Sequence, residues 1–183
     1  EMSASLVGSE MCIRDSISTG TPLWNYKVKQ ATVLYFALED DYPRLQRRLF
    51  KMFGADGTEN LYFATQCKTL DGGLDEQIRG FIREHPDTGL IIIDTLKRVR
   101  EVGGADYSYA SDYDVVAKLK ALADSCKVAM LIVHHTRKQQ AGDKFDTISG
   151  TNGLLGAADG AFVLSKETVS YTHLRAHETS AHL

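Results

Sequence analysis

Short apolar runs alternate with amphipathic stretches through the middle of the chain, whereas the two ends lack this alternation. Runs rich in β-branched and aromatic residues predict buried strands over residues 31–38, 61–64, 90–93, 128–133 and 161–164. Between these runs, apolar side chains recur at helical spacing. They predict helices over residues 41–53, from Leu74 to Ile82, and from Val115 to Cys126.

The alternation of strands and helices, with strands that are almost continuously apolar, predicts an α/β fold. We expect a mostly parallel sheet covered by helices on both faces. In such sheets, ligands bind beyond the carboxyl ends of the strands. The first candidates for a site are therefore the polar residues directly after the strands: Glu39 and Asp40, Asp94 and Thr95, and residues 134–137.

Composition narrows the class of protein. A chain of 183 residues has the size of one domain, and a net charge of −3 gives no global basic field, so any nucleic-acid contact must come from a local patch. Cys12, Cys67 and Cys126 form no C-x-x-C pair, which argues against a zinc site and fits a reducing compartment. No apolar run approaches the roughly 20 residues that span a bilayer, and the start lacks a signal-peptide pattern. We expect a cytoplasmic protein without a membrane partner.

Asp94 directly follows the strongest apolar run of the chain. A carboxylate at such a position can hold Mg²⁺, usually through water, beside the phosphates of a nucleotide. With Thr95 beside it, Asp94 is the candidate metal- and cofactor-binding position, although a strand-ending Asp can also cap a helix. Glu39 ends another strand and is the candidate that activates the attacking water. The alternative is that Glu39, Asp40 and Asp41 only favour the start of a helix.

The segment HHTRK, residues 134–138, follows a third strand. A histidine there can hydrogen-bond the terminal phosphate, and an arginine can offset its charge, so His134, His135 and Arg137 are further candidate catalytic residues. Adjacent side chains on an extended chain point in opposite directions, so we do not expect one metal ion to take both histidines. A lone histidine is more often a satisfied polar group. The place of this segment at a strand end favours function.

Two further segments are candidates for ligand contact. Lys97, Arg98 and Arg100 precede a loop with tyrosines, and positive charge with nearby aromatic rings suits single-stranded nucleic acid. A solvated helix end is the alternative interpretation. Residues 149–159 (SGTNGLLGAAD) are small, and their glycines permit close approach of a ligand backbone. This segment lacks the G-x-x-x-x-G-K-[ST] spacing of a phosphate-binding loop.

The two ends have a different character. Residues 6–16 (LVGSEMCIRDS) and 169–179 (VSYTHLRAHET) resemble peptides that arise when sequencing adapter is read as coding sequence. We therefore expect residues 1–18 and 169–183 to be non-native segments flanking a domain at 19–168. Disordered tails are the alternative.

Four segments in order resemble the RecA-like ATPases of the RepA hexameric replicative helicase type, of the AAA family: LYFALEDDYPRLQRRL, HPDTGLIIIDTLKRVR, LIVHHTRK and FDTISGTNGLLGAADGAFVL. The resemblance covers residues 31–164. It implies a RecA-like P-loop NTPase core, ATP and Mg²⁺ as cofactors, single-stranded DNA as a partner and a homo-hexamer.

The resemblance also implies roles for matching positions. Glu39 matches the catalytic glutamate, and Asp94 matches the Walker B aspartate that positions Mg²⁺. His134 and His135 match the γ-phosphate sensor, with Arg137 close behind. A further segment, which lies toward the DNA channel in RecA-like proteins, begins here with Ser149, Gly150 and Thr151.

The sequence departs from the family in one large respect, because it contains no G-x-x-x-x-G-K-[ST] motif. In the family, this motif and its strand precede the strand of Glu39, where residues 6–16 stand here. Without the N–H cradle and its lysine, a triphosphate loses its main anchor. The missing strand would be central, beside the strand of Asp94, and its loss would expose apolar edges.

We therefore expect a truncated RecA-like core, missing the P-loop strand, from an ATP-dependent, DNA-acting ATPase that is a replicative helicase. The chain itself is expected to be inactive. Two alternatives stay open: a non-unwinding RecA-like ATPase, such as a recombination mediator or helicase loader, and a catalytically dead RecA-like binding module.

Overall fold

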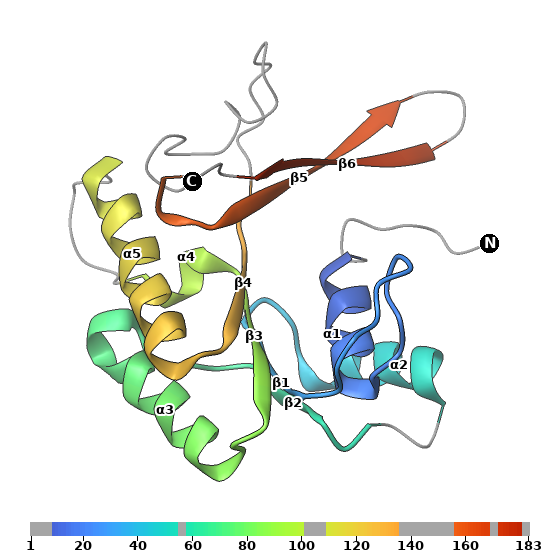
Figure 1. The fold of residues 1–183 in the computed structure, drawn as a ribbon, viewed down its shortest axis with the longest axis horizontal. Helices are drawn as coiled ribbons and strands as arrows, with labels where there is room; N and C mark the ends of the chain where they lie inside the picture. Colours follow the sequence, from blue (N-terminus) through green and yellow to red (C-terminus); the bar gives the residue numbers. More distant parts are fainter. Residues whose placement is uncertain (1–8, 55–57, 101–108, 136–155, 169–171, 181–183) are drawn as a thin grey trace. The chain divides into compact units, whose positions relative to one another are not determined.

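The structure, a computed structural model, describes residues 9–54, 58–100, 109–135, 156–168 and 172–180. Its elements in chain order are α1 (Ser9–Thr19), β1 (Thr32–Ala37), α2 (Tyr42–Phe53), β2 (Leu61–Ala64), a π-helical turn η1 (Leu70–Leu74), α3 (Asp75–Glu84), β3 (Thr88–Asp94), α4 (Leu96–Val99), α5 (Tyr109–Cys126), β4 (Ala129–Val133), β5 (Gly160–Thr168) and β6 (Thr172–Ser180) (Figure 1). The predicted helices and strands between residues 31 and 133 are confirmed, with ends shifted by a few residues.

The chain divides into two compact units. One unit comprises Ser9–Gly103 and Ala121–His134 and contains the four-stranded sheet. The described part of the other unit contains the N-terminal part of α5 and the pair β5 and β6. We describe each unit separately.

The four strands of the first unit form a parallel sheet in the order β2-β1-β3-β4. Ala37 of β1 pairs with Asp94 of β3, which in turn pairs with Val133 of β4. The carboxyl ends of these three strands therefore meet at one edge of the sheet. This arrangement confirms the predicted parallel α/β sheet, and it brings the residues that follow the strands to the same edge.

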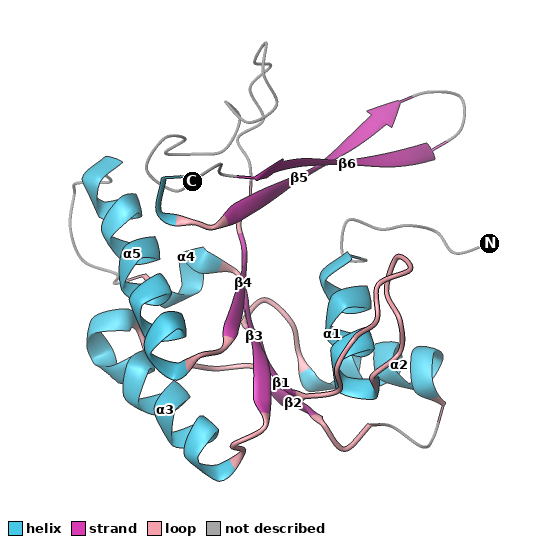
Figure 2. Ribbon diagram, viewed as in Figure 1, coloured by secondary structure: helices cyan, strands magenta, loops and turns pink. Residues whose placement is uncertain are grey.

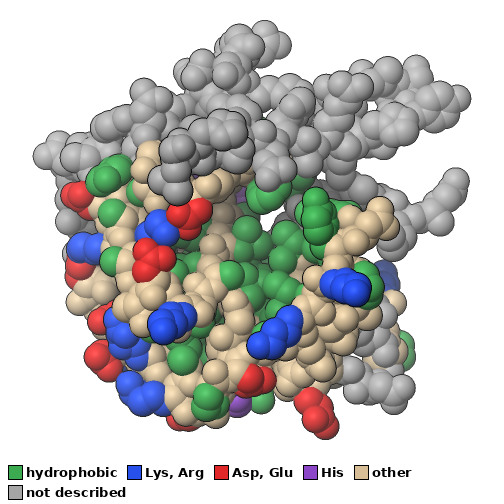
Figure 3. All heavy atoms as spheres, in the orientation of Figure 1, with side chains coloured by type: hydrophobic (Ala, Val, Ile, Leu, Met, Phe, Trp, Pro, Cys, Tyr) green, Lys and Arg blue, Asp and Glu red, His purple; other side chains and the backbone are tan. Residues whose placement is uncertain are grey.

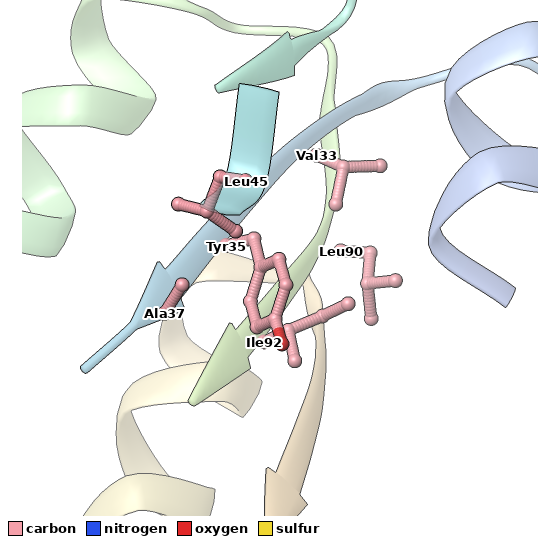
Figure 4. Close-up of a cluster of buried hydrophobic side chains, with 6 residues drawn as sticks. All are labelled: Val33, Tyr35, Ala37, Leu45, Leu90 and Ile92. Carbon is pink, nitrogen blue, oxygen red and sulfur yellow. The ribbon is translucent and has the colours of Figure 1, made fainter. Parts of the chain in front are cut away.

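Helices cover both faces of this sheet, as predicted: α1 and α2 lie on one side and α3 on the other (Figures 1 and 2). Successive side chains of a strand point to opposite faces. On one face, a buried cluster joins β1, β3 and α2, with Ile13 and Ile17 of α1 packed against it. Figure 4 shows this cluster: Val33, Tyr35, Ala37, Leu45, Leu90 and Ile92.

Helix α2 begins and ends where its sequence signals predict. Asp41 is extended, and its side chain accepts a hydrogen bond of 2.8 Å from the backbone N–H of Arg44, which satisfies a free donor of the first turn. Pro43 lies in that turn, where its missing N–H costs nothing. Gly54 ends the helix with a φ of 68°, a conformation that glycine adopts without strain.

Strand β3 is paired on both sides, with β1 and with β4. The apolar edges that the loss of a central strand was expected to expose therefore do not include β3, the strand of Asp94. β1 is buried along its whole length, whereas the side chains of β4 from Met130 to Val133 are only half buried. Figure 3 shows apolar side chains (green) accessible in the middle of one face of the molecule.

Residues 9–19 form helix α1, although the sequence pattern predicts no element there. Ile13 and Ile17 lie one helical turn apart and contact the core cluster. Ser18 is fully buried, and its carbonyl accepts a hydrogen bond of 3.1 Å from the Gln30 side chain. Two apolar residues form too short a pattern for a sequence-based prediction, yet they suffice when a sheet supplies the other surface.

The last predicted strand, at 161–164, exists but does not join the parallel sheet. It is part of β5, which pairs antiparallel with β6 in a separate two-stranded sheet. β6 forms within the segment 169–183, for which the pattern predicts no element. Antiparallel pairing of two neighbouring segments needs only a short connection, so it competes with a distant parallel partner. None of the helices in the described ranges has the length and apolar character that crossing a bilayer requires.

Candidate functional site at the carboxyl edge of the sheet

Asp94, the last residue of β3, projects from the carboxyl edge with its side chain half buried. The hydroxyl of Tyr35 on β1 donates a hydrogen bond of 2.7 Å to its Oδ2. Tyr35 is only 2% exposed, so the ring holds this donor rigidly inside the sheet's covered face. The hydrogen bond from Tyr35 therefore fixes the orientation of the Asp94 carboxylate.

Glu39 and Thr95 are also brought together. The hydroxyl of Thr95, which is 1% exposed, donates a hydrogen bond of 3.1 Å to Glu39 Oε1. The backbone N–H of Leu38 donates to the carbonyl of Asp94 at 2.7 Å, which ties the two strand ends together. The peptide bond between Asp94 and Thr95 is cis. Glu39 is exposed, so the side chain that Thr95 contacts is accessible to solvent.

The contacts separate Glu39 from its two acidic neighbours. Asp40 forms ion pairs with Arg44, at 3.2 Å, and with Arg48. Asp41 caps the start of α2. Both carboxylates therefore have structural roles within α2 and its cap, whereas Glu39 contacts the residue after Asp94. Of the three acids, Glu39 has the position that suits an acid–base group.

A buried arginine lies on the same face of the sheet. Arg14 of α1 is 1% exposed, and its guanidinium lies 5.5 Å from the ring centroid of Tyr35 and 5.3 Å from that of Phe63. Its ionic partner is Asp15, at 2.7 Å. Burial raises the pKa of the Asp15 carboxyl, and the adjacent Arg14 opposes that rise. A cation therefore packs on the ring of Tyr35, the residue whose hydroxyl holds Asp94.

The remaining sequence candidates are placed less completely. His134 follows β4 and is half buried, and the register of Val133 opposite Asp94 puts it at the same edge. His135 is exposed and belongs to the other unit. Four candidate residues lie outside the described part of the chain: Arg137, Ser149, Gly150 and Thr151.

The basic candidates near β3 are described. Lys97 and Arg98 are exposed on the short helix α4, and Arg100 after it is half buried.

Sequence reasoning missed Tyr35, Arg14 and the hydrogen bond between Thr95 and Glu39. Tyr35 looks like an ordinary core residue in an apolar strand. Only the register of β1 against β3 shows that its hydroxyl reaches the strand-ending acid. Arg14 lies in a segment to which the pattern assigns no element.

The donor chemistry at this edge fits a magnesium ion. Asp94 and Glu39 supply carboxylate oxygens, the ligands that Mg²⁺ prefers, and Mg²⁺ bound by one or two carboxylates keeps several waters. Within the described residues, no three metal-ligating side chains gather into a cluster. Such a cluster is not needed where phosphates and water complete the coordination.

Removal of the Tyr35 hydroxyl tests the support of Asp94. We expect Tyr35→Phe to fold and to lower the free energy of unfolding by about 1.5–3 kcal/mol, because a buried donor to a carboxylate is lost. Tyr26→Phe is the matched control, since Tyr26 is 74% exposed and its hydroxyl lies in solvent. Urea denaturation followed by circular dichroism measures both. Equal stability of the two variants would show that the hydrogen bond contributes nothing.

The parallel sheet, the helices on both faces and the acidic carboxyl edge define a class: an α/β domain with a doubly covered parallel sheet. The family described as AAA domain matches residues 11–141, and the chain belongs to this family. The match begins inside α1. It therefore includes part of the segment 1–18.

Two solved structures have the same fold. The chain superposes on a structure described as an ATPase domain with a TM-score of 0.60 and 16% sequence identity, covering 74% of this chain and 60% of that one. It superposes on "The Structure Of A DnaB-Like Replicative Helicase And Its Interactions With Primase" with a TM-score of 0.60 and 14% identity, covering 81% of this chain and 48% of that one. The chain thus spans about half to three fifths of these proteins. No curated protein sequence matches it.

Proposed function

We propose that the chain is the core of an ATP- and Mg²⁺-dependent ATPase that acts on DNA, a replicative helicase of the RepA type. The carboxyl-edge geometry carries this proposal. Tyr35 orients Asp94, Thr95 holds Glu39, and both carboxylates stand at one edge of a parallel sheet. The names of the two superposed structures, an ATPase domain and a replicative helicase, add support.

In this proposal, each residue at the edge has one task. Asp94 would hold Mg²⁺ through water, and the bound ion would supply positive charge that offsets the charge of nucleotide phosphates. Glu39 accepts a proton from the attacking water, and Thr95 keeps the Glu39 carboxylate aligned. His134 is the candidate sensor of the terminal phosphate, with His135 and Arg137 as the other candidates. Single-stranded DNA is the proposed partner, and a homo-hexamer is the proposed assembly.

Asp94 and Glu39 supply the ligands that a magnesium ion needs, whereas the chain lacks the groups that anchor a triphosphate. No G-x-x-x-x-G-K-[ST] sequence occurs in the chain, so the backbone N–H cradle and lysine that anchor β- and γ-phosphates are not among its residues. We therefore propose that the 183-residue chain by itself hydrolyses no ATP. The activity belongs to a protein in which this core is joined to a phosphate-binding loop.

The test is a fusion that supplies a strand and G-x-x-x-x-G-K-[ST] loop from the genomic sequence upstream of the core. We expect ATP turnover only in the fused protein and faster turnover with single-stranded DNA. We also expect displacement of a labelled strand from a forked duplex. ATP turnover without strand displacement would favour the non-unwinding alternative. Uninterrupted upstream coding without such a loop would favour the catalytically dead module and refute the proposed ATPase.

A further inference from the structure

One face of α2 carries a basic strip that the carboxyl-edge site does not use. Arg44, Arg47, Arg48 and Lys51 follow the spacing i, i+3, i+4 and i+7, which places them on one side of the helix. Leu45, on a different side of the helix, is 4% exposed and packs in the core cluster. Arg44, Arg47 and Lys51 are exposed and Arg48 is half buried, so the strip is accessible to solvent.

The charges of this strip are only partly compensated. Asp40 and Asp41 pair with Arg44, and Asp40 also pairs with Arg48. Among the described residues, no carboxylate pairs with Arg47 or Lys51. Four cations face two carboxylates, in a chain whose overall charge is −3. The excess of positive charge is thus a local feature of α2.

An exposed aromatic ring borders the cations. Phe50 is 64% exposed, and with Gln46 and the four basic residues it lines an open depression of about 620 Å³. The exposed phenyl ring of Phe50 offers apolar surface that a ligand can cover. Bases of an unpaired strand stack on such rings, and neighbouring cations follow the phosphates. We define Arg44, Arg47, Arg48, Phe50 and Lys51 as the α2 strip.

We propose that the α2 strip binds a single-stranded nucleic acid, with its cations on successive phosphates and Phe50 against a base. Three of the four cations are arginines, whose planar guanidinium groups match phosphate oxygens bidentately. Positions 44 to 51 span about 10 Å along the helix axis, at about 1.5 Å per residue, which is enough for a few phosphates. This inference rests on the proposed function for the class of its ligand, single-stranded nucleic acid, and adds the surface that binds it. Binding at the strip does not depend on hydrolysis, because the strip needs neither nucleotide nor Asp94.

Binding of the full 183-residue chain to a labelled oligothymidylate of about 16 nucleotides tests the proposal, without nucleotide or magnesium. Fluorescence anisotropy is measured from about 50 to 200 mM salt. For Arg47→Ala with Lys51→Ala, we expect weaker binding and a salt slope smaller by about 1.4, since each phosphate contact on a single strand contributes about 0.7. For Phe50→Ala, we expect at least about 5-fold weaker binding with the slope unchanged, because stacking carries no counterions.

Lys29→Ala with Arg83→Ala is the control, because both residues are exposed outside the strip and the charge change is the same. Circular dichroism confirms the fold of each variant. Wild-type affinity in the strip variant, or an equal loss in the control, would overturn the proposal. So would equal affinity for a duplex of the same length, or for polyglutamate, which would indicate a protein partner. Absence of all oligonucleotide binding would refute this inference and leave the ATPase test of the fused protein unaffected.

Discussion

Glu39→Gln is expected to abolish ATP hydrolysis in the fused protein that carries a phosphate-binding loop, while nucleotide binding persists. Glutamine keeps the shape of the side chain and can still accept the hydrogen bond from Thr95. It cannot take a proton from water. We expect kcat to fall by about 10²- to 10⁴-fold, the usual contribution of a positioned general base. Turnover by phosphate release and affinity by a fluorescent ATP analogue measure the two effects separately.

The matched control is Asp41→Asn, the same change of acid to amide two residues along. Asparagine caps a helix about as well as aspartate, so α2 should keep its start and turnover should stay near wild type. If Glu39→Gln turned over ATP at the wild-type rate, Glu39 would have no part in the reaction. If both variants failed equally, the loss would reflect the local fold rather than the base.

Ile92→Ala is expected to cause the largest loss of stability in the chain. Ile92 is fully buried at the centre of β3, in the cluster with Val33, Tyr35 and Leu90 (Figure 4). Removal of its outer carbons leaves a cavity in the core. The cavity cannot collapse unless β3 shifts, and such a shift would break its pairing with β1 and β4. We expect the free energy of unfolding to fall by about 2–5 kcal/mol. Urea denaturation of the full chain measures this loss.

Graded and surface variants make that test specific. Ile92→Val should cost only about 0.5–1.5 kcal/mol, because one methyl group is removed. Glu84→Ala, at an exposed position near the end of α3, should change stability by less than about 0.5 kcal/mol. A loss below about 1 kcal/mol for Ile92→Ala would mean that this sheet is not the stabilising core of the protein.

Much of the fold could be predicted from local pattern. The apolar runs that became β1 and β3 record burial on both faces, and the runs of β2 and β4 are apolar although less deeply buried. The apolar character is visible in each run by itself. The start of α2 is equally local, because Asp41, Pro43 and Gly54 act within a few residues of the helix they bound. The acids at the strand ends were found for the same reason: a parallel sheet directs its ligands to that edge whatever its register.

The pairing of segments could not be predicted in this way. β5 was expected to extend the parallel sheet, and it pairs with β6 instead. α1 was not expected at all, since Ile13 and Ile17 have meaning only against the surface that β1 and β3 provide. β5 pairs with β6, a segment that shows no strand pattern of its own. α1 packs against strands that lie further along the chain. In both cases the contact that decides the structure is not visible in the local sequence.

The candidate site was likewise predictable only in part from the sequence. The sequence by itself determined that acids stand after β1 and β3 and that no phosphate-binding motif accompanies them. Only the tertiary structure decided which acid is available: Asp40 is held by arginines, Asp41 caps a helix, and Glu39 meets Thr95. It also brought the Tyr35 hydroxyl to Asp94 across 59 residues of chain. Side-chain type is written residue by residue, whereas a hydrogen bond between strands depends on register, which the packing of the whole sheet sets.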